Sequence, residues 1–400
     1  MGGQKIDSSW KLMTPRNPSR QLTRYLADHI DADLTEKMVF LGGPRQVGKT
    51  TLSLGLLRPK GADESHAGYL NWDDIQARGP LLRGNLPPAQ QRIILDEIHK
   101  FKGWRNLVKG FYDKNKSKMS FLVTGSARLD YYRKGGDSLQ GRYHYYRLHP
   151  LSVNELGRRT ASSDLEQLLR FGGFPEPFLA ADEKSWRRWH RTRIERVVYQ
   201  DLRDLENVKE ISLIELLVEH LPACVGSPLS IKSLSDLLQV SHASVDRWIR
   251  MLERLYVCFR IPPFGSPKIR AVRKEKKLYF WDWSQVETPG ARFENMVASQ
   301  LLKYCHLLED TEGYRMELRF IRDTDKREID FVVLQEKKPL FAVEVKTGER
   351  RPSPATAYFR ERTSIRRFYQ VHLGEKDYGD AQRGVRVLPF ARFCKELRLP

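Results

Sequence analysis

The sequence lacks long apolar segments and closely spaced cysteines. No stretch of about 18 apolar residues occurs, so we expect no membrane-spanning helix. The first residues, MGGQKIDSSWKLMTPRNPSR, contain no apolar core and do not resemble a signal peptide. The 4 cysteines are far apart and show no CxxC spacing, a pattern that predicts neither a disulfide framework nor a zinc site. We therefore expect a cytoplasmic protein with reduced thiols.

Acidic residues are the second shortage. The chain has 50 Asp and Glu against 69 Lys and Arg, which gives a formal net charge of +19. Such a balance favours a polyanionic partner, most often nucleic acid, although solvated basic faces on a soluble protein would give the same count. The 400 residues exceed one ordinary core, so we expect two or three domains.

A glycine-rich motif follows the first strand-like run. Residues 38–41 are apolar, Gly42 ends the run, and GPRQVGKTT comes next. This stretch fits G-x-x-x-x-G-K-[ST], in which consecutive backbone N–H groups and the N-terminus of the next helix bind phosphates. Lys49 is expected to reach the β- and γ-phosphates, and Thr50 to ligate Mg²⁺. The predicted ATP contacts are Gly43, Pro44, Arg45, Gln46, Val47, Gly48, Lys49, Thr50 and Thr51.

Two further apolar runs end in polar residues. RIILDEIHK contains a strand-like run that ends in Asp96 and Glu97. We expect Asp96 to hold Mg²⁺ through water and Glu97 to polarise the attacking water; a strand with a solvated acidic tip is the alternative. FLVTGSARL ends in Thr124 and Ser126. A polar residue there, on a strand between the two earlier ones, would hold the water or the γ-phosphate.

Six motifs follow one another along the chain in a specific order: FLGGPRQVGKTTL, YLNWDD, ILDEIHK, VTGSAR, HPLSVNEL and FGGFPEP. This order resembles the bacterial and archaeal AAA+-type ATPases that pair an AAA_14 core with a DUF4143 C-terminal region. The resemblance implies an α/β P-loop core with a parallel sheet, followed by a helical lid. It also implies that Pro175 contacts the nucleotide from the lid, whereas an ordinary loop between helices is the alternative for that turn.

Arg142 lies just before another strand-like run, in LQGRYHYYRLHPLS. AAA+ proteins often place here an arginine that reaches the nucleotide of a neighbouring subunit, and a surface charge is the equal alternative. Because an arginine acting in trans requires a second copy, we expect a homo-oligomeric ring, for example a hexamer.

Residues 223–265 carry the pattern of a winged helix-turn-helix. A helix is expected at 231–238, a turn at 240–242 and a second helix at 243–255, and the strand-like YVCFRIPPF follows as a wing. Arg247, Arg250 and Arg254 lie outside the apolar stripe of the second helix and are predicted DNA contacts; a packing module without DNA contact is the alternative. The preceding arginine-rich residues 185–210 predict an amphipathic helix whose basic face touches phosphates or is solvated and ion-paired.

The stretch PKIRAVRKEKKLYF is densely basic. Like charges at this density repel one another unless an anion is present, so the stretch favours contact with nucleic acid. Its basic residues are Lys268, Arg270, Arg273, Lys274, Lys276 and Lys277, the first four of which are our predicted DNA contacts.

Acids and a lysine gather near the end of the chain. Glu294 lies in GARFENMVASQLLKYC, an amphipathic helix pattern, and Asp330 opens the run IDFVV. Glu344 and Lys346 are two apart in FAVEVK, which places them on one face of a strand. The polar residues between the two runs suit a hairpin. Glu294, Asp330 and Glu344 are therefore candidate metal ligands, with Glu344 and Lys346 as candidate catalytic groups for phosphodiester hydrolysis.

The spacing Glu…Asp-x13-Glu-x-Lys resembles the PD-(D/E)xK nuclease superfamily, which includes archaeal junction resolvases. Ile329 stands where the name of the superfamily has proline, a frequent departure. Gln370, in RRFYQVHLG, is a further candidate from a later strand. A hairpin whose acids and lysine pair on the surface is the alternative, and the resemblance implies the fold rather than cleavage.

Together these patterns predict an α/β protein with five regions. They are an N-terminal segment 1–35, a P-loop AAA+ core 36–157, a helical lid 158–222, a winged helix 223–265 and a nuclease-like domain 266–400. The favoured function is an ATP- and Mg²⁺-dependent motor on duplex or branched DNA, either a helicase or translocase or a remodelling enzyme. The alternatives are an ATP-licensed metal-dependent endonuclease and a nucleotide-controlled switch in defence or signalling.

Overall fold

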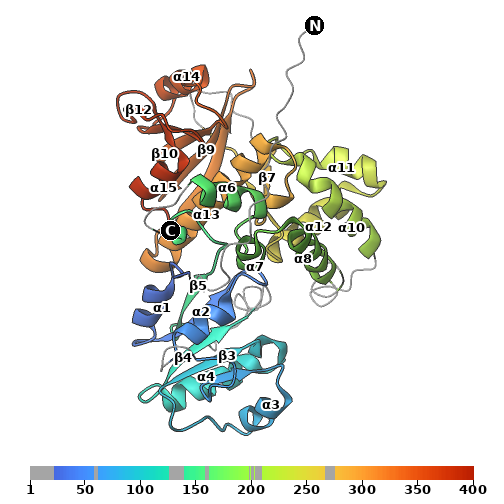
Figure 1. Cartoon of the computed structure of the whole chain (residues 1–400). Coiled ribbons are helices and arrows are strands. Elements are labelled where there is room, and N and C mark those ends of the chain that lie inside the picture. The colour runs from blue at the N-terminus through green and yellow to red at the C-terminus, as the bar shows by residue number, and fades with distance from the viewer. Residues whose placement is uncertain are drawn as a thin grey trace.

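Two sheets dominate the structure and lie towards opposite ends of the molecule, with helices between and beside them (Figure 1). The structure, a computed structural model, describes residues 22–57, 62–125, 139–157, 162–197, 199, 202, 210–265 and 275–400. In these ranges no helix combines the length and the apolar character needed to cross a membrane.

The N-terminal sheet has five strands, all parallel. They are β1 (Met38–Gly42), β2 (Tyr69–Asn71), β3 (Arg92–Asp96), β4 (Ser120–Thr124) and β5 (Tyr143–Arg147), in the spatial order β2-β3-β4-β1-β5. β4 lies between β1 and β3, as expected from the sequence, and Val123 is opposite Phe40 on one side and Leu95 on the other. The carboxyl ends of these three strands therefore meet at one edge of the sheet.

Helices cover both faces of this sheet: α1 (Ala27–Asp33), α2 (Lys49–Gly55), α3 (Ile75–Leu82), the short η1 (Ile98–Lys100) and α4 (Trp104–Asn115). Every residue of β1 is buried, as is typical of a parallel strand that is covered on both sides. One face packs against Ile30 of α1 and Leu52 of α2, and the other against Trp104 and Val108 of α4. The sheet thus provides a rigid platform for the side chains at its edge.

A helical region follows the sheet, between residues 154 and 224, and includes most of the predicted lid; we call it the lid. Its elements are η3 (Asn154–Leu156), α6 (Ser162–Phe171), α7 (Pro175–Ala180), α8 (Glu183–Arg196), α10 (Ile211–His220) and η5 (Leu221–Cys224). Pro175 takes the first position of α7, where the missing N–H of proline is harmless. The side chain of Asp182 accepts a hydrogen bond from the backbone N–H of Ser185 and so caps α8.

A helix-turn-helix and a hairpin come next: α11 (Ile231–Leu238), α12 (His242–Arg254), β6 (Cys258–Ile261) and β7 (Lys277–Phe280). Both helices begin and end within one residue of the predicted positions, and Ser230 and Ser241 cap them. Val245, Ile249 and Leu252 are buried, as their spacing predicted. β6 and β7 pair antiparallel, so the boundary expected between residues 265 and 266 falls inside one hairpin.

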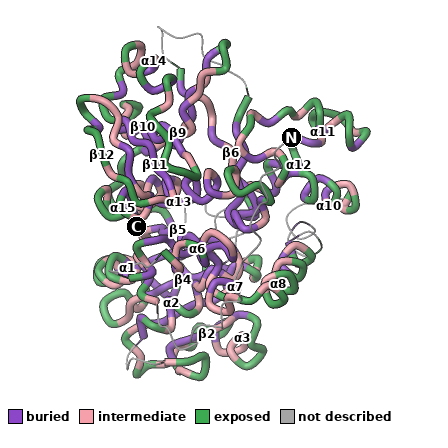
Figure 2. Tube along the Cα trace, turned by 45° about the horizontal axis from the view of Figure 1, so that its top comes forward, coloured by how far each residue is buried: buried purple, intermediate pink, exposed green. Residues whose placement is uncertain are grey.

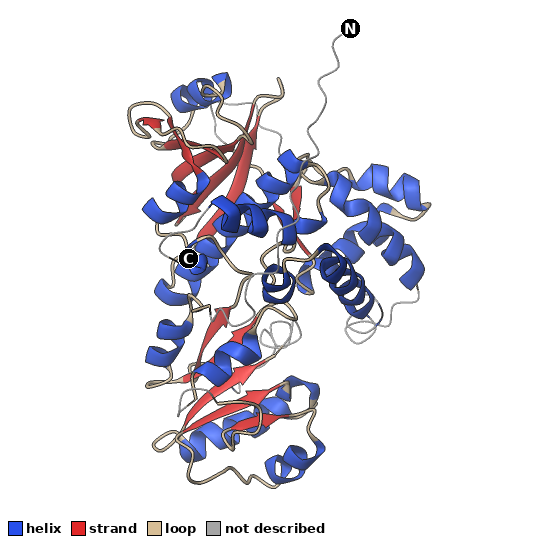
Figure 3. Cartoon of the chain, in the orientation of Figure 1, coloured by secondary structure: helices blue, strands red, loops and turns tan. Residues whose placement is uncertain are grey.

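The C-terminal sheet is mixed (Figure 3). β8 (Met316–Arg322), β9 (Glu328–Gln335) and β10 (Lys338–Val345) form an antiparallel meander, which includes the predicted hairpin. β11 (Phe368–His372) and β13 (Arg386–Pro389) continue it in parallel, with β12 (Tyr378–Gly379) at the edge. The remaining elements are η6 (Trp283–Gln285), α13 (Pro289–Glu312), α14 (Pro354–Arg362) and α15 (Phe390–Glu396).

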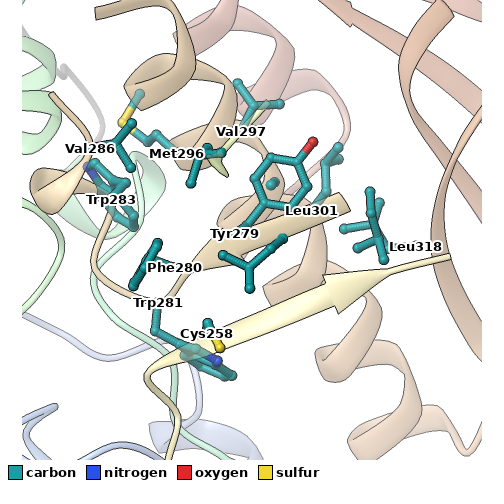
Figure 4. Close-up of a cluster of buried hydrophobic side chains, with 14 of the residues drawn as sticks. Cys258, Tyr279, Phe280, Trp281, Trp283, Val286, Met296, Val297, Leu301 and Leu318 are labelled. Carbon is teal, nitrogen blue, oxygen red and sulfur yellow. The ribbon is translucent and has the colours of Figure 1, made fainter. Parts of the chain in front are cut away.

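One hydrophobic core joins the lid, the winged helix and the C-terminal sheet. The long helix α13 lies at its centre, and Figure 4 shows Met296, Val297 and Leu301 of α13 beside Tyr279 and Phe280 of β7. Figure 2 shows the buried stretches following the strands of both sheets. By packing, the described chain therefore divides into a P-loop half and a second half built around this core. A smaller cluster lies on the C-terminal sheet beside α14, and Phe174 and Trp189 of the lid pack into the P-loop half.

Candidate functional site

The loop between β1 and α2 has the backbone conformation that phosphate-binding loops need. Gly43 and Gly48 have φ values of +135° and +94°, a region that glycine enters without penalty. A Cβ atom on Gly43 would lie 2.5 Å from the carbonyl oxygen of Leu148, so no larger residue fits there. Lys49 is buried, and its Nζ donates to the carbonyl oxygens of Gly43 (3.1 Å) and Pro44 (2.7 Å). The predicted phosphate contacts thus form one compact turn.

Asp96, at the end of β3, is the centre of a buried hydrogen-bond network. Its Oδ2 accepts from the Thr50 hydroxyl (3.0 Å) and the Tyr69 hydroxyl (2.7 Å), and its Oδ1 accepts from the Thr124 hydroxyl. Thr50, Asp96 and Thr124, which the sequence placed in one site, therefore do lie together. Burial and the bond to Asp96 raise the pKa of Tyr69, which keeps its hydroxyl protonated as a donor. Tyr69 lies in the recognised motif YLNWDD, but no spacing rule assigned it a role.

Glu97 follows Asp96 in an unusual backbone conformation. Its φ of 55° lies in the left-handed region, which costs a residue with a Cβ about 1 kcal/mol or more. Its backbone N–H donates to the carbonyl oxygen of Thr124 (3.1 Å). Burial raises the pKa of Glu97, and Lys100, whose Nζ is 3.4 Å from Oε2, opposes this shift. The conformation turns the side chain of Glu97 into the cleft described next, as a residue that orients water would require.

The P-loop and the lid enclose a cleft of about 400 Å³. From the core it is lined by the P-loop, Asp96 and Glu97, and from the lid by Pro175, Glu176, Arg193, Arg196 and Val197. The predicted lid contact, Pro175, is therefore at the cleft. α7 and α8 bring it there, and both are visible beside the P-loop half in Figure 1.

Arg193 is a residue of this cleft that the sequence did not single out. It is 3% exposed, its guanidinium lies 4.3 Å from the centre of the Phe174 ring, and Nη2 donates to the carbonyl oxygen of Tyr256 (3.4 Å). Its Nη1 has no hydrogen-bond partner in the described part of the chain. Burial lowers the pKa of Arg193, with Asp282 opposing. The arginine-rich pattern of residues 185–210 was the signal, but a pattern cannot say which arginine faces a ligand.

Arg24 supports the P-loop from behind, and the sequence gave no sign of this. Its Nη1 donates to the carbonyl oxygen of Val47 (2.6 Å), and its Nε donates to Oε1 of Glu155 (2.8 Å). Glu155 also contacts the ammonium of Lys303 in α13. Burial alone would raise the pKa of Glu155, but Arg24 and Lys303 together lower it to about 2. The P-loop is therefore linked to α13 by buried charges.

The other two residues predicted at the ATP site stay predictions. Arg142 precedes the edge strand β5, and its Nε donates to Oδ1 of Asp113 in the same chain (2.9 Å). It is only partly exposed, at 34% of its side chain, in that ion pair. Ser126 lies outside the described residues.

The acids and the lysine near the end of the chain also converge. Nζ of Lys346 donates to Oε1 of Glu344 (2.6 Å), and the backbone N–H of Val345 donates to Oδ2 of Asp330 (2.8 Å). Glu344 Oε2 is buried without a hydrogen-bond partner in the described structure. Burial raises the pKa of Asp330 and of Glu344. Gln370 instead holds the loop after β10, because its Nε2 donates to the carbonyl oxygen of Arg350 (2.7 Å).

Lys277 belongs to the basic stretch that favoured contact with nucleic acid, but its side chain lies among these acids instead. Its side chain is fully buried, and Nζ is 3.1 Å from Oε1 of Glu294, 3.7 Å from Oδ1 of Asp330 and in direct contact with Glu328. Burial opposes the charge, but Glu294, Asp330 and Glu328 raise the pKa of Lys277. We call Glu294, Glu328, Asp330 and Glu344 the carboxylate cluster. The sequence missed Lys277 because five neighbouring basic residues share its stretch.

The predicted metal ligands differ in how well they suit a divalent ion. Thr50 and Asp96 supply hard oxygen atoms at the phosphate loop, which is what Mg²⁺ prefers when it binds with a nucleotide. Across the described ranges, no group of three or more His, Cys, Asp or Glu is arranged to hold a metal ion. At the carboxylate cluster the Lys277 ammonium lies where such an ion would be needed. Glu294, Asp330 and Glu344 therefore do not fit a metal in this arrangement.

The predicted DNA contacts of the winged helix are on its surface. Arg247, Arg250 and Arg254 are all exposed on α12, opposite the buried stripe. Arg250 pairs with Asp246 (3.0 Å), and Arg247 is 3.8 Å from Glu210. Lys268, Arg270, Arg273 and Lys274 lie outside the described residues.

Comparison with known families matches three consecutive parts of the chain. Residues 35–157 match the AAA_14 family model, described as an AAA domain. Residues 162–287 match DUF8612 and residues 289–393 match DUF4143, both described as domains of unknown function. The AAA_14 and DUF4143 matches confirm the family resemblance seen in the motifs.

Individual relatives are distant. The chain is 22% identical over 344 residues to the uncharacterized protein MJ1544 of Methanocaldococcus jannaschii, which covers 78% of this chain and 75% of that protein. It is 27% identical over 246 residues to the uncharacterized protein Rv2008c of Mycobacterium tuberculosis, covering 61% and 54%.

Among solved structures, the Orc1 protein of Aeropyrum pernix in complex with DNA is similar over 68% of this chain and 90% of its own, at 14% identity and a TM-score of 0.32. The STAND protein PH0952 of Pyrococcus horikoshii, which has a tetratricopeptide repeat sensor, is similar over 74% and 50%, at 12% identity and a TM-score of 0.23.

Proposed function

Because the chain carries an AAA domain at residues 35–157 and a DUF4143 domain at residues 289–393, we propose that it is an ATP-driven motor that acts on DNA. Its output is strand separation, translocation or the remodelling of branched DNA, and its C-terminal half holds the strands. The observation that carries the proposal is the 3.0 Å hydrogen bond between Thr50 and Asp96. This pair lines the same cleft as Arg193 and Arg196 of the lid. This arrangement joins a phosphate loop, an acid pair and a helical cover in one cleft.

The P-loop residues bind and orient the triphosphate. Backbone N–H groups of residues 43–48 surround the phosphates, and Lys49 exchanges its two carbonyl partners for a phosphate oxygen. The exchange is favourable because a charged acceptor makes a stronger hydrogen bond than a neutral carbonyl. Arg24 keeps the loop in shape during the exchange through its bond to the Val47 carbonyl.

Thr50 and Asp96 would hold Mg²⁺ beside the phosphates. When bound, the ion neutralises the charge that develops on the phosphate oxygens. Tyr69 and Thr124 fix the carboxylate of Asp96 from two other strands. Glu97 then orients the attacking water, and Arg193 and Arg196 reach the γ-phosphate from the lid. Because Arg193 lies on α8, loss of the γ-phosphate would remove this contact and release α8 from the nucleotide.

The DNA part of the proposal is supported by charge. The chain carries a formal net charge of +19, and α12 presents three arginines outward from a helix-turn-helix. Copies of the chain would complete one another's sites through Arg142, which lies at an edge strand of the core.

A direct test measures ATP hydrolysis and strand separation together. Labelled linear, forked and four-way DNA are incubated with the protein, with and without ATP, and with a Lys49→Ala variant as control. We expect DNA to stimulate hydrolysis and ATP to drive separation, with both lost in the variant. Hydrolysis that ignores every DNA would contradict the motor and favour a nucleotide-controlled switch.

An ATP-licensed endonuclease is the second candidate, and it requires that Lys277 leave the carboxylate cluster so that a metal ion can bind there. It is favoured by the contact between Glu344 and Lys346 and by the buried oxygen of Glu344 that has no hydrogen-bond partner in the described chain. The Glu344→Ala variant distinguishes it, because nicking of DNA would disappear while ATP hydrolysis continued.

A further inference from the structure

Lys277 reaches the carboxylate cluster from another part of the chain. It lies on β7, in the hairpin of the winged helix, whereas Glu294 lies on α13, Glu328 and Asp330 on β9 and Glu344 on β10. Tyr279 is two residues further along β7 and therefore on the same face of the strand. Its hydroxyl donates to the same oxygen of Glu294 that Lys277 contacts, at 2.7 Å. The hairpin thus inserts two polar side chains into the cluster.

The Lys277 ammonium is buried and has three carboxylates and one aromatic ring around it. Glu294, Glu328 and Asp330 surround it, and the ring of Phe320 lies 5.7 Å from Nζ. A buried ammonium is tolerated only when carboxylates or other acceptors compensate it. Three acids in contact with one lysine provide that compensation.

Two more cationic side chains contact the cluster. Lys346 pairs with Glu344, and Arg322 Nη1 donates to Oε2 of Glu328 (2.7 Å). Four carboxylates therefore face three cationic side chains, which leaves one formal negative charge in the cluster. A divalent ion would bring two more positive charges to within a few ångströms of the Lys277 ammonium, where repulsion is strong at low dielectric.

We propose that Lys277 is the resident cation of the carboxylate cluster and takes the place of a metal ion, so that the cluster serves to fasten the winged-helix hairpin to the C-terminal sheet. The acids that the sequence predicted as metal ligands then have a different task. They hold β7, the strand that follows the basic stretch, against α13 and β9. This inference is independent of how the ATP site works.

The test is binding of Mn²⁺ to the full chain without nucleotide, followed by electron paramagnetic resonance and calorimetry. Wild type, Glu344→Gln and Asp330→Asn are compared first. We expect the same Mn²⁺ binding in all three, because any ion at the P-loop is common to them. A Mn²⁺ site in wild type that either substitution removes would overturn the proposal.

A gain-of-function variant makes the test stricter. Lys277→Met removes the charge and keeps the length of the side chain. We expect it to bind Mn²⁺ at least about tenfold more tightly than wild type, since the acids now lack their cation. The added ion should also raise the melting temperature of this variant alone. Both effects should vanish in the double variant Lys277→Met/Glu344→Gln.

Two controls isolate the position of the charge. Lys276→Met removes a charge from the neighbouring, exposed residue, and Lys277→Arg keeps a cation inside the cluster. Neither should gain a Mn²⁺ site. A folded Lys277→Met protein without such a gain would contradict the proposal, and if this variant does not fold, the wild-type comparison still decides. ATP hydrolysis by the same wild-type preparation tests the proposed motor separately.

Discussion

At the P-loop, Lys49 donates to two backbone carbonyls, whereas at the C-terminal sheet Lys277 lies among three carboxylates. Both lysines are buried, and each site combines a lysine with acids, which come from the end of β3 at the P-loop and from α13, β9 and β10 at the C-terminal sheet. A neutral carbonyl leaves the charge of Lys49 available to an incoming anion, while the carboxylates around Lys277 already neutralise it. The same residue types therefore make a site that is prepared for a ligand in one half and a closed internal contact in the other.

One helix connects the two regions. α13 carries Glu294, which contacts Lys277, and about two and a half turns later Lys303, which contacts Glu155 and so the Arg24 network behind the P-loop. Its last turns carry Asp310, whose Oδ1 is 2.6 Å from Nη2 of Arg147 at the end of β5. α13 is therefore a continuous helical connection between the P-loop network and the carboxylate cluster.

The largest expected effect separates the two lysines by activity. Lys49→Ala should lower ATP hydrolysis by about 100-fold to 1,000-fold, because a charged donor to the transferring phosphate is lost. Its free energy of unfolding should change less than that of a lysine ion-paired with buried acids, since the hydrogen-bond partners of Lys49 are neutral carbonyls. Phosphate release and urea unfolding are measured on the same protein, with Lys114→Ala, an exposed lysine of α4, as control. Unchanged ATP hydrolysis by Lys49→Ala would contradict the proposal that the P-loop is the site of hydrolysis.

The converse effect is expected for Lys277. Lys277→Ala should lower the free energy of unfolding by about 4 kcal/mol, because three carboxylates lose their buried partner. Hydrolysis at the P-loop should persist in the protein that remains folded. Urea unfolding of Lys276→Ala provides the matched comparison, and a loss of equal size in that variant would show that net charge rather than position matters.

The contrast between the sites also explains what the sequence revealed. The P-loop turn and the acids of β3 were predictable because each rule needs only a few neighbouring residues and a strand before them. The position of Thr124 at the site was predictable because its strand was expected between the two strands that end at the P-loop and at Asp96. Lys277 and Arg193 were not, because their partners are brought together by packing between separate regions. In both cases a dense run of basic residues concealed the one that folds inward.

A third expected effect tests the link between the halves and depends on pH. Glu155 has a pKa of about 2, below its usual value of 4.5, so its charge stabilises the fold above about pH 4.5 and stops doing so as the pH falls towards 2. Glu155→Gln should therefore lower the free energy of unfolding by about 3 kcal/mol at pH 7. Measured by urea unfolding, the difference from wild type should shrink between pH 4.5 and pH 2. A difference that does not depend on pH would mean that shape, not charge, holds the network.

A smaller effect is expected at the lid. Arg193→Ala should reduce ATP hydrolysis about tenfold, since one charged contact with the γ-phosphate is lost. Binding of ADP, which lacks that group, should be nearly unchanged when it is measured by calorimetry. Arg188→Ala removes an exposed arginine of the same helix and serves as control. Equal losses for ATP and ADP would place Arg193 in the structure of the lid rather than at the γ-phosphate.

The smallest expected effect concerns α12, where arginines face solvent instead of a buried partner. Replacing Arg247, Arg250 and Arg254 with alanine together should weaken DNA binding several-fold and reduce its dependence on salt, because each phosphate contact contributes about one unit to that slope. Arg250 already pairs with Asp246, which limits its gain from DNA. Fluorescence anisotropy at several salt concentrations measures both quantities. The matched control replaces Lys114, Lys116 and Lys118, which are exposed on the P-loop half. An equal loss of DNA binding in this control would mean that binding depends on overall charge and not on the helix-turn-helix.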